Sequence, residues 1–121
     1  MKRPSNKELY NKIKHALELS SNETLRIIDP ATLVADAIEL GYMVRDLQTT
    51  LISVLNEIGP GNYAGTRPPQ KSYKVQIKDS ELFAFSWKSK IFGCEAYVKF
   101  CFKNDCLYLV SLHRDRKEKG G

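Results

Sequence analysis

Apolar residues recur three or four positions apart through the first half of the chain, the spacing of amphipathic helices. A first helix is expected to begin after Ser5, because Ser5 and Glu8 have the spacing of a capping box. A second is expected to begin after Asp29, which precedes a proline, and to end at Gly41. A third is expected over about residues 45–58. The positions predicted to face the core are Leu9, Ile13, Ala16, Leu17, Leu33, Val34, Ala37, Leu47, Leu51, Val54, Leu55 and Ile58.

In the second half, the pattern changes to alternation of apolar and polar residues, which is typical of strands. Strands are expected at about 73–78, 81–88, 95–103 and 107–113, with a further short strand at 25–28. Helices followed by consecutive strands predict an α+β fold, with the helices packed on one face of a curved, three- or four-stranded antiparallel sheet. We interpret residues 1–121 as a single domain, with helices over about 5–58, a Gly- and Pro-rich connector over 59–72, the sheet over 73–113 and a basic tail over 114–121.

The pairing of the last two strands decides which side chains share a face, since a slip of one residue exchanges the faces of a strand. A two-residue turn at Asn104 and Asp105 would set polar residues opposite apolar ones. A three-residue loop that also includes Cys106 gives one wholly apolar face, and we prefer it. This register predicts the pairs Val98–Leu112, Phe100–Val110, Phe102–Tyr108, Tyr97–His113 and Lys99–Ser111, with Phe83, Phe85 and Trp87 continuing the apolar face.

Charge is distributed unequally along the chain. The formal net charge is +5, of which residues 1–60 carry −1 and residues 61–121 carry +6. A basic sheet-forming half favours contact with a polyanion. No apolar run approaches the roughly 20 residues of a membrane span. Three cysteines, an odd number, argue against a disulfide framework. We therefore expect a cytoplasmic protein without cofactor, metal site or membrane contact.

The polar face of the predicted final hairpin has the residues that metal-independent RNA cleavage needs. In that reaction the 2′-hydroxyl of RNA attacks the adjacent phosphorus, a base takes its proton and an acid protonates the leaving 5′ oxygen. Histidine titrates near neutral pH, so His113 is the candidate acid, or the base if the roles are reversed. Tyr97 is a candidate to position a phosphate oxygen, to shuttle a proton or to stack a base, and Lys99 is a candidate to hold the phosphate. The candidate RNA-binding residues around them are Lys88, Ser111, Arg114 and Arg116.

Residues 96–100 (Ala-Tyr-Val-Lys-Phe) and 109–113 (Leu-Val-Ser-Leu-His) resemble the C-terminal strands of the motility quorum-sensing regulator (MqsR) family of toxins. Residues 35–41 and Tyr63 are similar to that family's helical region and its Phe-Tyr-Lys segment, so the resemblance covers roughly residues 7–114. It implies a RelE-like fold and an endoribonuclease that cleaves mRNA. The implied partners are mRNA and a cognate antitoxin, with the ribosome as a further candidate. The family's catalytic Tyr and C-terminal basic residue match Tyr97 and His113.

The chain departs from the family pattern at two positions. Ala64 stands where the family has a catalytic Lys, and Lys71 or Lys74 is the candidate replacement. The family's Gln on the strand before Tyr97 has no clear counterpart, and Ser86 and Lys88 are the nearest residues. Two other functions fit the same residues: a non-catalytic RNA- or ribosome-binding module, and a protein-interaction domain.

Overall fold

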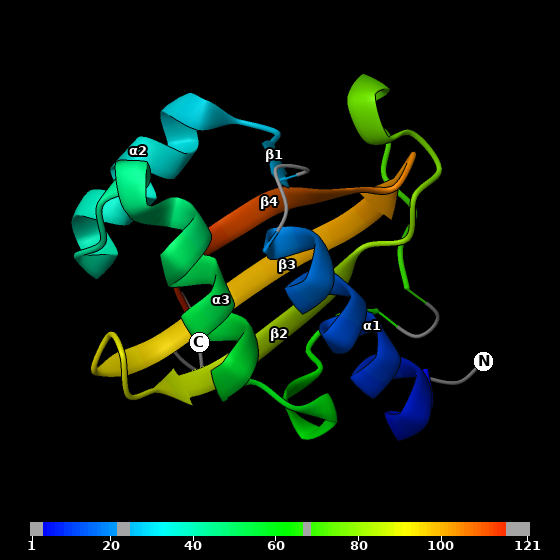
Figure 1. Cartoon of the computed structure of the whole chain (residues 1–121), viewed down its shortest axis with the longest axis horizontal. Coiled ribbons are helices and arrows are strands. Elements are labelled where there is room, and N and C mark those ends of the chain that lie inside the picture. Colours follow the sequence, from blue (N-terminus) through cyan, green and yellow to red (C-terminus); the bar gives the residue numbers. More distant parts are fainter. Residues whose placement is uncertain (1–3, 22–24, 67–68, 116–121) are drawn as a thin grey trace, which may run out of the picture.

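The computed structural model describes residues 4–21, 25–66 and 69–115. Within these ranges, three α-helices lie on one face of a four-stranded sheet (Figure 1). The chain is α+β, as the sequence predicts. The helices are α1 (Asn6–Ser20), α2 (Pro30–Leu40) and α3 (Leu47–Glu57), and the strands are β1 (Leu25–Ile27), β2 (Phe83–Ser89), β3 (Cys94–Lys103) and β4 (Cys106–Arg114).

The helices begin and end where the local signals predict. Ser5 accepts a hydrogen bond from the Glu8 amide at 3.1 Å, and the Glu8 carboxylate accepts one from the Ser5 amide at 3.4 Å. Asp29 caps α2 through the Thr32 amide, and Gly41 ends that helix with a φ of 92°, in the left-handed region that glycine adopts without strain. Val34, which was predicted to be buried, is 47% exposed, so the buried side of α2 lies nearer Asp36 and Leu40.

The sheet is mixed, with strand order β1-β4-β3-β2. β1 pairs with β4 in parallel, so the prediction of a purely antiparallel sheet is wrong. The predicted strand at 73–78 is also wrong. Val75–Ile77 form one turn of 3-10 helix, within a loop closed by backbone hydrogen bonds between Ser72 and both Asp79 and Ser80. Tyr73 is 88% exposed, so its β-forming side chain has no neighbouring strand to pack against.

The β3–β4 hairpin has the shorter of the two turns considered from the sequence, followed by a β-bulge. Asn104 and Asp105 have φ values of 53° and 61° and form the two-residue turn that pairs Lys103 with Cys106, so the expected three-residue loop is wrong. A β-bulge then leaves Val110 as an extra residue between the Phe100–Leu109 and Lys99–Ser111 pairs. Beyond the bulge, the predicted pairs Tyr97–His113, Val98–Leu112 and Lys99–Ser111 are confirmed. Nearer the turn, the pairs are Phe100–Leu109 and Phe102–Leu107, so the predicted partners of Phe100 and Phe102 are wrong.

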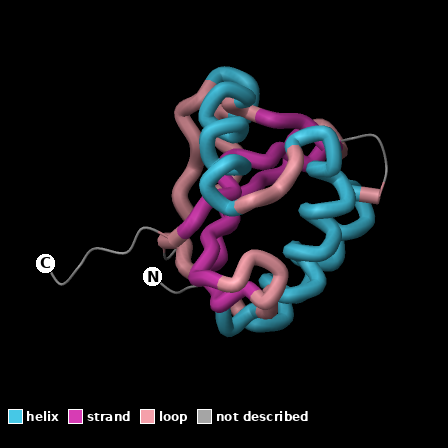
Figure 2. The backbone as a smooth tube through the Cα atoms, turned by 90° about the vertical axis from the view of Figure 1, so that its left-hand side faces the viewer, coloured by secondary structure: helices cyan, strands magenta, loops and turns pink. Residues whose placement is uncertain are grey.

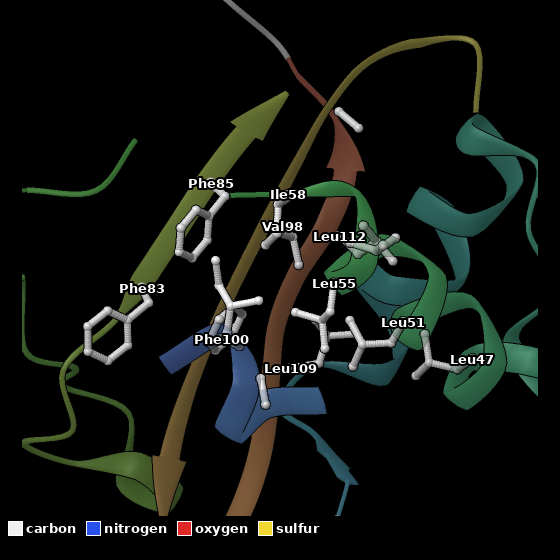
Figure 3. Packing of buried hydrophobic residues seen from close by; sticks show 14 of the residues in the cluster. Leu47, Leu51, Leu55, Ile58, Phe83, Phe85, Val98, Phe100, Leu109 and Leu112 are labelled. Carbon is white, nitrogen blue, oxygen red and sulfur yellow. The ribbon is translucent and has the colours of Figure 1, made fainter. Parts of the chain in front are cut away.

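The core lies between the helices and the inner face of the sheet. Aromatic rings of β2 and β3 pack together there, with Phe85 and Phe100 stacked at 5.7 Å between centroids (Figure 3). Leucine side chains of α3 and β4 complete the cluster. The labelled core residues of Figure 3 are Leu47, Leu51, Leu55, Ile58, Phe83, Phe85, Val98, Phe100, Leu109 and Leu112. Among the described helices, none combines the length and apolar character that crossing a membrane requires.

Candidate functional site

The outer face of the sheet, opposite the helices, carries two rows of cross-strand partners, most of which are polar. In the first row, Ser86 of β2 lies opposite Tyr97 of β3, which lies opposite His113 of β4. In the second row, Ala84, Lys99 and Ser111 align in the same way. Cross-strand partners share a face, so the predicted Tyr, Lys and His come together on one side of the hairpin. Figure 2 shows the helices gathered on the other side of the strands.

Tyr97 and His113 form a stacked pair at the centre of this face. Their ring centroids are 5.0 Å apart and the ring planes differ by 16°. Nδ1 of His113 lies 2.7 Å from the carbonyl oxygen of Arg114. Because a carbonyl oxygen only accepts hydrogen bonds, Nδ1 is the donor, and Nε2 is the ring nitrogen left to exchange a proton with a substrate. Nζ of Lys99 lies 5.9 Å from the centre of the Tyr97 ring, which adds a positive charge beside the pair.

The connector before β2 covers the neighbouring part of this face and forms a wall of the site. The amide of Ala64 donates to the carbonyl of Ala84 at 2.8 Å, which fixes the connector beside β2. A small pocket of about 90 Å³ opens between the connector and the sheet. Its lining residues are Ala64, Gly65, Thr66, Gln70, Leu82, Ala84, Tyr97 and Lys99. Since Tyr97 and Lys99 line it from the sheet, the pocket adjoins the stacked pair.

The phenol of Tyr97 is held in its neutral form. Burial, followed by the negative charge of Asp115 and the proximity of Tyr63, raises the pKa of Tyr97 above the usual value of tyrosine. A neutral phenol donates a hydrogen bond and makes a poor base. Tyr97 is therefore suited to bind a negatively charged oxygen rather than to take a proton.

Asp115 belongs to the site, although we did not single it out in the sequence. Its carboxylate accepts a short hydrogen bond from the hydroxyl of Ser86, the first member of the Tyr97 row. Its amide donates to the carbonyl of Glu95 at 2.9 Å, so the chain stays beside β3 for one residue beyond β4. The available signal was alternation: Asp115 is two residues after His113 and shares its face if the strand continues.

The other sequence-predicted residues are dispersed around this centre. Lys88 shares the outer face but is exposed and paired with Glu95, away from the pocket. Ser111 lies opposite Lys99, beside the site. Arg114 is opposite the buried Ala96, so it is on the helix-covered face of the sheet and not on the face of His113. Arg116 lies outside the described residues.

The two lysines proposed to replace the Lys absent at position 64 lie on the connector. Lys71 is exposed and bridges to Glu81 through the backbone. Lys74 is exposed near Asp29, whose pKa is lowered mainly by hydrogen bonds from Thr32 and further by the charge of Lys74. Neither lysine lines the pocket beside Tyr97. Lys99 is the cation that the described residues bring to the stacked pair.

Fold and site together define a small α+β protein whose sheet presents a stacked tyrosine and histidine, flanked by a lysine and a carboxylate, on the face away from its helices. No protein-family model and no curated protein matches the chain in the comparisons.

Proposed function

We propose that the chain is an endoribonuclease that cleaves mRNA by attack of the RNA's own 2′-hydroxyl, and that it acts in the cytoplasm as the toxin of a type II toxin–antitoxin system. The proposal combines the resemblance of residues 7–114 to the MqsR family with the arrangement of the outer face. The observation that carries it is the stacking of Tyr97 on His113 at 5.0 Å, with Lys99 beside them. A RelE-like fold is part of the same proposal.

Each of the three side chains has a separate role in this reaction. Nε2 of His113, when protonated, gives its proton to the 5′ oxygen as the P–O5′ bond breaks. The neutral phenol of Tyr97 donates a hydrogen bond to a non-bridging phosphate oxygen, on which charge accumulates in the transition state. The Lys99 ammonium attracts the same phosphate through its charge. The products are a 2′,3′-cyclic phosphate and a 5′-hydroxyl end.

The growth of a bacterial host tests this assignment. Induced expression of the wild-type chain should arrest growth, whereas Tyr97→Phe should relieve the arrest because one transition-state donor is worth roughly 10²–10³ in rate. His113→Ala should relieve it too, because general acid catalysis contributes roughly 10²–10⁴. Tyr108 lies opposite Cys101 and His15 lies on α1, both outside the row, so Tyr108→Phe and His15→Ala are matched controls that should remain toxic.

Immunoblotting of the soluble fraction would verify that all variants accumulate equally. Full toxicity of both site variants would contradict the assignment. Binding of RNA without cleavage would favour the RNA- or ribosome-binding alternative, and a lack of RNA affinity at low salt would favour a protein-interaction domain.

A further inference from the structure

We infer that Asp115 is the general base of the reaction proposed above, taking the proton of the attacking 2′-hydroxyl while Ser86 holds its carboxylate in place. The inference rests on the proposed ribonuclease function and adds to it the group that accepts this proton. Tyr97 does not suit that task, because burial keeps its phenol protonated. With His113 as the acid, the reaction needs a second titratable group on the same face.

The topology brings the Asp115 carboxylate next to the row of Ser86, Tyr97 and His113. Asp115 follows β4, yet its hydrogen-bond partner Ser86 is on β2, and β3 lies between those strands. Neighbouring strands are about 4.8 Å apart, so the contact requires Asp115 to reach over β3. Ser86 is directly opposite Tyr97, so the carboxylate is adjacent to the ring that His113 stacks upon.

The carboxylate has one oxygen that remains suited to receive a proton. Ser86 donates to Oδ2, and within the described part of the chain no hydrogen bond is recorded to Oδ1. Asp115 is half-buried, whereas the neighbouring carboxylate of Glu95 is exposed. A carboxylate that is fixed by a hydrogen bond and partly desolvated is well placed for proton transfer. The titratable and charged side chains that share this face with Asp115 are Lys88, Glu95, Tyr97, Lys99 and His113, with Tyr63 contributing from the connector.

Opposite charges lie on the two sides of Tyr97 along β3. Lys99 lies two residues toward one end of the strand, and Asp115 is beside Glu95, two residues toward the other. A phosphate over Tyr97 would have the ammonium on one side and the carboxylate on the other. A carboxylate weakens the binding of a polyanion. A role in catalysis accounts for a carboxylate at this position, although its charge opposes the binding of RNA.

Oδ1 of Asp115 takes the 2′-hydroxyl proton as the 2′ oxygen forms its bond to phosphorus. The P–O5′ bond breaks, and the proton on Nε2 of His113 moves to the 5′ oxygen. Asp115 then loses its proton to water and His113 regains one, which restores both groups without a redox change or another reactant.

The test compares wild type with Asp115→Asn on a short RNA, measuring kcat against pH in parallel with binding of the same sequence carrying 2′-O-methyl groups. Asp115→Asn should lower kcat by roughly 10²–10⁴ and remove the acidic limb of the pH–rate profile. Binding of the methylated RNA should be unchanged or tighter, because a negative charge has been removed. Ser86→Ala should lower kcat by about tenfold, and Ser86→Thr should restore it by returning the hydroxyl.

Glu95→Gln is the matched control and should keep both kcat and the acidic limb, and circular dichroism would verify that each variant is folded. Wild-type turnover by Asp115→Asn, or loss of the acidic limb in Glu95→Gln instead, would overturn the assignment of Asp115 and leave the ribonuclease proposal intact. A wild-type protein that binds the RNA but does not cleave it would overturn both.

Discussion

Tyr97 acts in this scheme as a hydrogen-bond donor whose protonation does not change near neutral pH. Because burial raises its pKa above the usual value of tyrosine, the phenol is protonated throughout the neutral pH range. The ratio of wild-type to Tyr97→Phe cleavage rates should therefore stay constant between about pH 6 and pH 8.5. A ratio that rises steadily with pH would indicate that the phenolate is the active form.

The three cysteines should differ in reactivity for the same physical reason. Cys101 is 0% exposed, and this burial raises the pKa of its thiol to about 11 despite the opposing charge of Lys103. Cys94 and Cys106 are partly exposed. Alkylation of the native protein followed by peptide mass spectrometry should modify Cys94 and Cys106 and leave Cys101 unmodified. The denatured protein serves as the control in which all three react. Equal native labelling of Cys101 would contradict its burial.

Individual residues of the site were predictable where strand alternation decided their direction. Tyr97, Lys99 and His113 were found because cross-strand pairs keep side chains on one face. Asp115 was missed because its role depends on a contact with Ser86, 29 residues earlier in the chain. A local pattern contains no information on such a contact. Arg114 follows His113 directly and so faces the other side of the strand. Strand alternation predicts this, and we overlooked it.

Among the elements, α3 holds the β2–β3 turn through one carboxylate. Glu57 accepts hydrogen bonds from Trp87 Nε1 and Ser89 Oγ, each at 2.8 Å, and from the backbone amides of Lys90 and Ile91 at 2.8 and 3.2 Å. Partial burial opposes ionisation of Glu57, but these hydrogen bonds outweigh it and lower its pKa. The Glu57 carboxylate thereby links the β2–β3 turn to the helical layer.

Glu57→Gln should destabilise the fold by about 1–3 kcal/mol at neutral pH, because it weakens hydrogen bonds to a charged acceptor. Since the pKa of Glu57 is lower in the folded state than in the unfolded state, its contribution is complete above the unfolded pKa. The contribution is lost as the pH falls through the folded pKa. Urea unfolding at neutral and acidic pH should show the difference from wild type shrinking in acid. Exposed Glu18→Gln is the control. An equal difference at both pH values would contradict a role for the charge.

The elements themselves were predictable to the extent that local signals define them. Capping at Ser5 and Asp29 and the left-handed Gly41 fixed the helix ends correctly, because these interactions span only a few residues. The strand expected at 73–78 was wrong because β-propensity does not reveal whether a partner strand is present. The pairing of Val110 with Phe100 was wrong because the sequence did not distinguish a long turn from a short turn followed by a bulge.

At the scale of the whole molecule, the sequence predicted the α+β class and the helices on one face but not the mixed sheet. The parallel pairing of β1 with β4 joins segments about 80 residues apart, which lies beyond any local pattern. The division of charge was informative in a different way. Residues 61–121, which supply three of the four strands in the described part of the chain, carry the excess of +6. The candidate site therefore lies on the basic half of the chain.

The central claim is that the outer face of the sheet cleaves RNA through Tyr97 and His113. Its most direct test is incubation of purified wild-type protein with a defined single-stranded RNA in EDTA, followed by mapping of the ends. We expect fragments with 2′,3′-cyclic phosphate and 5′-hydroxyl ends, no cleavage of RNA with 2′-deoxy sugars, and at least roughly 10²-fold slower cleavage by His113→Ala. Intact RNA after incubation with folded wild-type protein, or fragments with 5′-phosphate ends, would contradict the claim.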